Sequence, residues 1–470
     1  MQMYLHPDIS RPLMKTCEEV LIQKHAQLLR GEFQVLLDSD RPDNLQRMYN
    51  LLSRVPDGLD PLRTKFEVHV RRVGLSAIDK IADDGGDNVE TKAYVETLLE
   101  VHTQYYSLVN TVFNGETEFV RSLDNACREF VNRNKLCKSA SIKSPELLAK
   151  YSDSLLRKSA KRAEESDLET KLTAIVTVFK YVEDKDVFQN FYSKMLAKRL
   201  VSFTSVSDEA EMSMIGKLKE ACGFQYTNKL QRMFQDMQIS KDLNESYKTW
   251  LEAKSVEGNG VDVSCLVLGT SFWPLNPRST PFNIPEVILR PYSRFAEYYN
   301  EKHTGRKLTW LWHLSRGELM ANYCKNAKVP YIFQVSTYQM AILLLFNDRA
   351  TISYEEIKKN VGVTREYLDP SLGIMLKANV LTISPAGLKP GPSTQLTLNA
   401  DFKSKKIRVN LNTAVRADEK KESDETHKTI KEDRKHLMQV RWPPPPHLRK
   451  KVAIRWGVFL IFHSLPLCAS

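Results

Sequence analysis

The sequence predicts a mainly α-helical protein with a small α+β part, and three patterns support this fold class. Over roughly the first 255 residues, apolar positions recur three and four residues apart, as in 45–52, which is the spacing of one helix face. The stretch "VDVSCLVLGTSFWP" (261–274) is rich in β-branched residues and follows a Gly-Asn-Gly turn. From Thr337 the order changes to three helices followed by two strands.

The first two segments are predicted to be helical bundles, 1–140 and 141–255. In the first, the turn residues 56–58 and 83–87 separate helices. The second opens at Ser144, with Ser144 as N-cap and Pro145 in the first helical position. Its stretch "DVFQNFYSKMLAKRL" (186–200) combines an apolar stripe with a basic side, a pattern typical of a core helix with a solvated face.

The third predicted segment, 256–336, is a small α/β domain. Strands are expected at 261–267, 307–314 and 331–336, with a helix around 292–301.

Residues 337–412 have the element order of a winged helix, and 413–439 are expected to form a linker helix. A winged helix raises the alternative of nucleic-acid binding. Its third helix, however, carries Arg365 and Lys377 against Glu366 and Asp369, with Pro370 between them, whereas a base-reading helix aims Arg, Lys, Asn or Gln into the groove.

Composition limits the remaining classes of function. The 470 residues carry 68 Lys and Arg against 57 Asp and Glu, a net charge of +11, and the mean hydropathy is -0.39. Five of those positive charges, and no acid, follow Gln439. Neither a signal peptide nor a stretch of about 20 apolar residues is evident, so a soluble protein of cytoplasm and nucleus without a membrane partner is expected.

Catalytic motifs are not apparent. The seven cysteines are scattered, with Cys127 and Cys137 the closest pair, which predicts neither disulfides nor a zinc site, and no cofactor is expected. Cys222 has no neighbouring His that would activate it as a nucleophile, so a buried thiol is the favoured interpretation. His303 and His313 are isolated in the sequence.

Several long strings resemble the cullin family, in that family's order. They are "DKDVFQNFYSKMLAKRL", "EMSMIGKLKEACGFQYTNKLQRMFQDMQISKDLN", "HTGRKLTWLWHLSRGEL", "STYQMAILLLFN", "KKIRVNLN" and "THKTIKEDRK". The resemblance runs from about Leu5 to Gln439 and is greatest to the cullins of Skp, cullin and F-box ubiquitin ligases. It implies a scaffold that does no covalent chemistry itself.

The resemblance also implies partners. A cullin's α/β domain takes up an N-terminal strand of a RING-box protein, which recruits a ubiquitin-conjugating enzyme, and a cullin-associated exchange factor is a further partner of this family. A sheet edge suits an added strand, because the strand satisfies backbone donors and acceptors. The residues expected to line the RING-box site are Val261, Val263, Leu266, Leu308, Trp310 and Leu311.

Two basic clusters resemble the cullin groove that attracts the acidic tail of certain conjugating enzymes. The first is cluster 157–162, with Arg157, Lys158, Lys161 and Arg162, and the second is cluster 403–406, with Lys403, Lys405 and Lys406. Each alone is typical of a solvated face; together they are expected to speed encounter with an acidic partner.

Compared with the family, the chain is expected to lack both ends of a cullin. The first repeat, where an adaptor and substrate receptor would dock, has no counterpart here. From Val440 onward, four consecutive prolines exclude a continuing helix, and the 440–470 tail is expected to be disordered. No neddylation lysine is expected, because its domain has no counterpart; only Lys450 and Lys451 could substitute for it.

Overall fold

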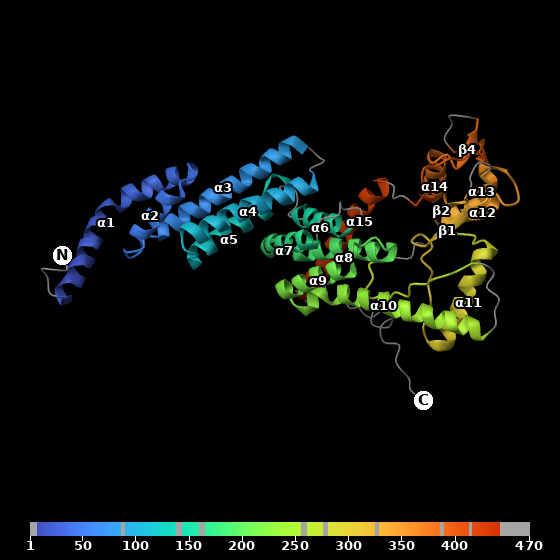
Figure 1. Cartoon of the computed structure of the whole chain (residues 1–470), viewed down its shortest axis with the longest axis horizontal. Coiled ribbons are helices and arrows are strands. Elements are labelled where there is room, and N and C mark those ends of the chain that lie inside the picture. Colours follow the sequence, from blue (N-terminus) through green and yellow to red (C-terminus); the bar gives the residue numbers. More distant parts are fainter. Residues whose placement is uncertain are drawn as a thin grey trace, which may run out of the picture. The chain divides into compact units, whose positions relative to one another are not determined.

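A computed structural model describes residues 7–85, 90–137, 143–158, 165–254, 261–275, 281–324, 329–385, 390–412 and 416–441. The fold is mainly helical with two small sheets, as the sequence predicts. The chain divides into two compact units (Figure 1): unit 1 comprises Met1–Met237 and Leu268–Pro274, and unit 2 comprises Gln238–Val267 and Leu275–Ser470.

Unit 1 is built from helices. They are α1 (Pro7–Asp38), α2 (Pro42–Leu52), α3 (Asp60–Gly85), α4 (Thr91–Val112), α5 (Thr117–Asn132), the short 3-10 helix η1 (Lys135–Cys137), α6 (Lys143–Leu156), α7 (Glu165–Tyr181), α8 (Lys185–Ser202), α9 (Asp208–Cys222) and the first half of α10 (Phe224–Ala253). Helices α3, α4 and α5 lie side by side (Figure 1).

Aromatic side chains form the core of the first five helices. The rings of Phe113 and Phe119 stack with centroids 4.0 Å apart, and Phe66 meets both edge-on at 5.6 Å. The turn after α2 is as compact as its sequence predicts: a Cβ on Gly58 would lie 2.2 Å from the Leu52 carbonyl oxygen, so only glycine fits there.

The expected N-cap of the second bundle is wrong. Helix α6 begins at Lys143, two residues before the predicted first helical residue, and Ser144 lies inside it. The buried Ser144 hydroxyl donates to the Val131 carbonyl at 2.6 Å and so joins α6 to the end of α5.

Unit 2 contains the remaining elements. They are the second half of α10, α11 (Glu286–Lys302), β1 (Arg316–Ala321), β2 (Tyr331–Ser336), α12 (Thr337–Leu345), β3 (Thr351–Ser353), α13 (Tyr354–Val361), α14 (Arg365–Lys377), β4 (Leu381–Ser384), β5 (Gln395–Leu398), β6 (Arg408–Asn410) and α15 (Arg416–Arg441). Helices α11 to α14 confirm the helices expected there.

The two sheets of unit 2 have three strands each. The first has the order β1-β2-β6, with β1 antiparallel and β6 parallel to β2, and the second has the order β3-β5-β4. Strand β6 thus leaves the winged-helix sheet and pairs with β2. Strands β1, β3 and β4 were not expected from the sequence.

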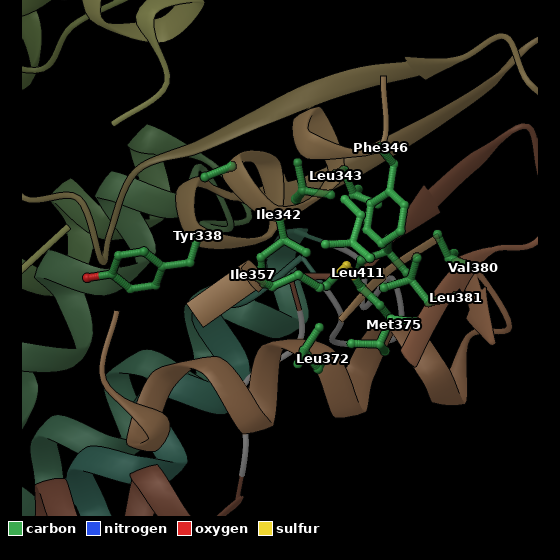
Figure 2. Packing of buried hydrophobic residues seen from close by; sticks show 14 of the residues in the cluster. Tyr338, Ile342, Leu343, Phe346, Ile357, Leu372, Met375, Val380, Leu381 and Leu411 are labelled. Atoms are coloured by element: carbon green, nitrogen blue, oxygen red, sulfur yellow. The ribbon is translucent and has the colours of Figure 1, made fainter. Parts of the chain in front are cut away.

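One apolar core joins the three helices of the winged helix to both sheets. It contains Phe333 and Val335 of β2 together with Leu396 of β5. Figure 2 shows Ile342 and Leu343 of α12, Ile357 of α13, and Leu372 and Met375 of α14 together in this core, while the Tyr338 ring points away from them. Helix α12 begins with a capping box, in which the Ser336 hydroxyl accepts from the Gln339 N–H and the Gln339 side chain accepts from the Ser336 N–H.

Two strand predictions are wrong. Residues 261–267 and 307–314 belong to no strand, although alternation of their side chains favours extended chain. Neither segment forms a ladder with another segment among the described residues. Among the described helices, none combines the length and the apolar character that crossing a bilayer requires.

Candidate functional site

An aromatic cluster in unit 2 organises the candidate site. Its buried residues are Leu243 and Tyr247 of α10, Cys265, and Phe295, Tyr298 and Tyr299 of α11. Tyr247 meets Phe295 edge-on, with ring centroids 5.2 Å apart. We call this set the α10–α11 cluster; two segments of irregular structure pack on it.

The first segment, 261–267, packs on the cluster through every second side chain. Val263, Cys265 and Val267 contact the α10–α11 cluster, whereas Asp262 and Ser264 are exposed. This alternation is that of a half-buried strand. The backbone groups of Cys265 and Val267 bond to side chains of α10. Within the described part of the chain, those of Ser264 and Leu266 make no hydrogen bond.

The second segment, 307–311, packs on the same cluster. Leu308 and Trp310 contact it, while Thr309 between them is exposed. The Trp310 ring meets Tyr292 edge-on at 4.8 Å and lies 5.7 Å from the ring of Trp312. Among the described residues, the backbone groups of 307–310 have no hydrogen-bond partner. The site therefore combines extended chain with unpaired backbone edges.

Three of the six residues expected at a RING-box site, Val263, Leu308 and Trp310, lie in or against the cluster. Leu266 and Leu311 are partly buried and lie outside it, and Val261 is 41% exposed. Whether any of them touches a partner stays a prediction.

In cluster 157–162, Arg157 is already engaged in an ion pair. Its Nε donates to Asp153 Oδ2 at 2.7 Å. Lys158 is exposed, and its backbone N–H donates to the Thr204 carbonyl at 2.8 Å. Lys161 and Arg162 lie outside the described residues, as do Lys450 and Lys451.

In cluster 403–406, all three lysine side chains are exposed. The loop that carries them is anchored by the buried ring of Phe402, which meets Tyr331 and Phe333 edge-on at 5.2 and 5.3 Å. The Tyr331 hydroxyl also donates to the Ser404 carbonyl at 3.4 Å. These lysines are therefore presented from a fixed backbone.

A buried ion network in unit 1 was missed by sequence reasoning. The guanidinium of Arg199, which is fully buried, bonds both carboxylate oxygens of Glu211 at 2.7 and 2.8 Å and also bonds Asp153. Burial lowers the pKa of Arg199, but the bonds and charge of Glu211 raise it more, so its net pKa lies above the ordinary value. Arg199 is therefore a charged core residue, tied to α6 and α9.

The described residues offer little support for catalysis. Burial raises the pKa of the Cys222 thiol, although Lys185 opposes this, so the reactive thiolate is disfavoured. The six described cysteines are free thiols, and no described group of three His, Cys, Asp or Glu side chains could hold a metal ion.

The winged helix also lacks the features of a base-reading module. On α13 and α14, acidic Glu355, Glu356, Glu366 and Asp369 oppose basic Lys358, Lys359, Arg365 and Lys377. Arg365 lies 3.9 Å from Glu355. Charge in this region is balanced, so phosphate attraction would be weak, and the nucleic-acid alternative is not favoured.

Comparison with known proteins identifies the family. A model of the cullin α-solenoid domain matches residues 1–244, and a model of the cullin α+β domain matches 267–402. The chain belongs to the cullin family. Relatives similar to this cullin chain include Cullin-1 of Schizosaccharomyces pombe, 50% identical over 440 residues, and Cullin-1 of Dictyostelium discoideum, 45% identical over 456 residues.

Coverage of these relatives is incomplete. The alignments include 93% and 96% of this cullin chain but 57% and 59% of the two Cullin-1 proteins. Cullin-1 of Caenorhabditis elegans is 39% identical, with 93% of this chain and 56% of that protein aligned. The chain thus spans a little over half the length of the curated relatives that it matches.

Proposed function

We propose that this cullin chain is a non-catalytic scaffold subunit of a ubiquitin ligase. It binds a RING-box protein by accepting a strand at segments 261–267 and 307–311, and the bound RING-box protein positions a ubiquitin-conjugating enzyme. Family membership supports the scaffold role. The single observation that carries the binding mode is the pair of extended segments with unpaired backbone edges over one aromatic cluster.

The physical basis is that unpaired strand edges attract another strand. Each added backbone hydrogen bond contributes roughly 0.5–1.5 kcal/mol. Side chains on alternate residues of the added strand could cover the partly buried Val263, Leu308 and Trp310, which lie at the border of the α10–α11 cluster. Affinity would then come from the backbone, and specificity from these apolar contacts.

Co-expression with a RING-box protein, followed by purification, tests this proposal. Trp310→Asp should abolish co-purification, because it places a charge in the aromatic cluster. Thr249→Asp is the matched control, since Thr249 is exposed on α10, belongs to neither segment and should tolerate the charge. Folded wild-type chain that fails to retain the RING-box protein would refute the proposed function.

A duplex-binding assay at several salt concentrations separates this proposal from the nucleic-acid alternative. A scaffold with balanced charge on α13 and α14 should show no specific binding. Tight binding that weakens steeply with salt would favour the alternative instead.

A further inference from the structure

Side chains on one face of α10 hold segment 261–267 in place. Asn244 Nδ2 donates to the Cys265 carbonyl at 2.7 Å, and the Cys265 N–H donates to Asn244 Oδ1 at 2.8 Å. The hydroxyl of the buried Ser240 donates to the Val267 carbonyl at 3.2 Å and accepts from the Val267 N–H at 2.9 Å. Two helix side chains thus occupy both backbone groups of two alternate residues, as a neighbouring strand would.

The geometry of helix and strand explains why this arrangement repeats. Four helical residues advance about 6.0 Å, and two extended residues advance about 6.6 Å, so Ser240 and Asn244 match Val267 and Cys265 with little mismatch. The same step occurs in unit 1, where Asp236, four residues before Ser240, accepts from the N–H of Gly269, two residues after Val267, at 2.8 Å. We call the Ser240 and Asn244 bonds the side-chain ladder.

The ladder determines which backbone edge stays open. In extended chain, the N–H and C=O groups of successive residues point to opposite sides. Since those of Cys265 and Val267 face α10, those of Ser264 and Leu266 face away from it. Among the described residues, these two have no backbone partner.

We propose that Ser240 and Asn244 are positioning residues for partner binding: their ladder holds 263–267 extended, so that Ser264 and Leu266 are ready to pair with an incoming strand. This inference rests on the proposed function, because it presumes that a RING-box strand docks here. Ordering the acceptor before binding lowers the entropy lost on association. Neither side chain touches the partner in this account; both act through the segment that they bond.

The binding test compares two double variants of α10. Ser240→Ala with Asn244→Ala removes the ladder, and the Kd for a RING-box protein should rise at least about tenfold. Gln238→Ala with Ser246→Ala is the matched control: it removes one amide and one hydroxyl from the same helix, and the partner of each among the described residues is Asp242. Its Kd should stay within about twofold of wild type. Asn244→Asp keeps the acceptor for the Cys265 N–H and loses the donor, so an intermediate Kd is expected.

Residue-resolved amide hydrogen exchange provides a second readout that a general loss of stability would not produce. In the free wild-type chain, the amides of Cys265 and Val267 should exchange slowly and those of Ser264 and Leu266 quickly. The partner should then protect the second pair. In the ladder variant, the first pair should lose protection while the α11 amides keep theirs.

The outcomes separate the two proposals. A ladder variant that loses protection at Cys265 and Val267 and yet binds with wild-type Kd would overturn the positioning role and leave the proposed function intact. Equal exchange rates at all four amides of the free chain would overturn the side-chain ladder, whether or not the RING-box protein binds. A wild-type chain with the expected exchange pattern that binds no RING-box protein would refute the proposed function, and the positioning role with it.

Discussion

Arg199 is fully buried and bonds Glu211 and Asp153, although it lies in a basic stretch whose charges favour solvent. Nothing in the local sequence indicates this, because Asp153 and Glu211 lie 46 and 12 residues away in the chain. A buried charge of this kind is tolerated only with its partners in place.

Arg199→Ala should therefore be strongly destabilising. It leaves the fully buried Glu211 without its counter-charge, at a cost of about 3–5 kcal/mol. Arg157→Ala is the control: Arg157 is 43% exposed, and Asp153 keeps its bond to Arg199, so less than about 1 kcal/mol is expected. Urea unfolding, followed by the intrinsic fluorescence of the aromatic side chains in unit 1, measures the free energy of unfolding of both variants. Equal effects of the two substitutions would contradict this account of the network.

His69 gives unit 1 a pH-dependent contact. It is 4% exposed on α3, its Nδ1 lies 3.2 Å from Asp38 of α1, and its Nε2 is bonded to the Tyr105 hydroxyl of α4 at 2.8 Å. Burial lowers the pKa of His69, against the opposing charge of Asp38. The unfolded chain therefore binds a proton more readily than the folded one, and stability is lost as the pH falls below about 6.5.

Amide exchange of α3 peptides, corrected for the intrinsic effect of pH, should show faster local opening at pH 5.5 than at pH 7.5, two values chosen to bracket the ordinary histidine pKa of about 6.5. His69→Gln should flatten this difference, since glutamine cannot be protonated. His25→Gln, on the exposed surface of α1, should retain it. An unchanged pH difference in His69→Gln would show that another group is responsible.

At the candidate site, the sequence predicts some of the residues that pack on the α10–α11 cluster but not the residues that hold segment 261–267. The resemblance to cullins directed attention to Val263, Leu308 and Trp310, and their apolar alternation predicts the half-buried packing that the structure shows. Ser240 and Asn244 could not be predicted, because polar residues four apart on a helix are ordinary until the segment that they bond is known.

At the scale of elements, helices were predicted well and strands poorly. Helix α13, for example, depends on local periodicity and on the Ser353 capping box, both of which the sequence displays. A β-strand depends in addition on a second strand that pairs with it, and this partner can lie far away in the sequence. Residues 261–267 alternate like a strand but pair with no neighbouring strand among the described residues. Strand β6 pairs with β2, 76 residues earlier, whereas the order of elements in the sequence predicts that it pairs within the winged helix.

Gly362 terminates α13 with a left-handed conformation, φ +69°, and a Cβ there would lie 2.9 Å from the Asn283 side chain. Gly362→Ala should therefore destabilise the winged helix by about 1 kcal/mol or more. Gly373 of α14 has open space around its Cβ position, so Gly373→Ala should stabilise by roughly 0.5–1 kcal/mol. Thermal unfolding of the two variants should shift in opposite directions; shifts of the same sign would contradict the conformational argument.

At the scale of the whole molecule, the distribution of charge matters more than its total. Five of the eleven net positive charges follow Gln439, which leaves +6 on the rest of the chain (11 − 5 = 6). Cluster 403–406 concentrates three of its cations on an anchored, exposed loop. Such a patch can steer an acidic partner toward the loop.

Reversing Lys403, Lys405 and Lys406 to Glu should slow ubiquitin-chain formation, by roughly tenfold at low salt, because steering raises association rates by about that factor or more. RING-box binding should be unaffected. Reversal of Arg349, Lys359 and Lys377 changes the net charge equally at other exposed positions and is the control. A slowdown that persists undiminished at high salt, or one that the control variant shares, would exclude local electrostatic steering.

The proposed function requires unit 2 to accept a strand from a RING-box protein. The most direct test is to co-express the chain with an intact RING-box protein and, separately, with one whose N-terminal strand is deleted, and to measure the stoichiometry of the purified complexes. The account predicts a stable one-to-one complex with the intact partner, newly protected amides at Ser264 and Leu266, and no complex with the deleted form. Equal binding of the two forms, or a complex with the intact partner that leaves those amides unprotected, would contradict it.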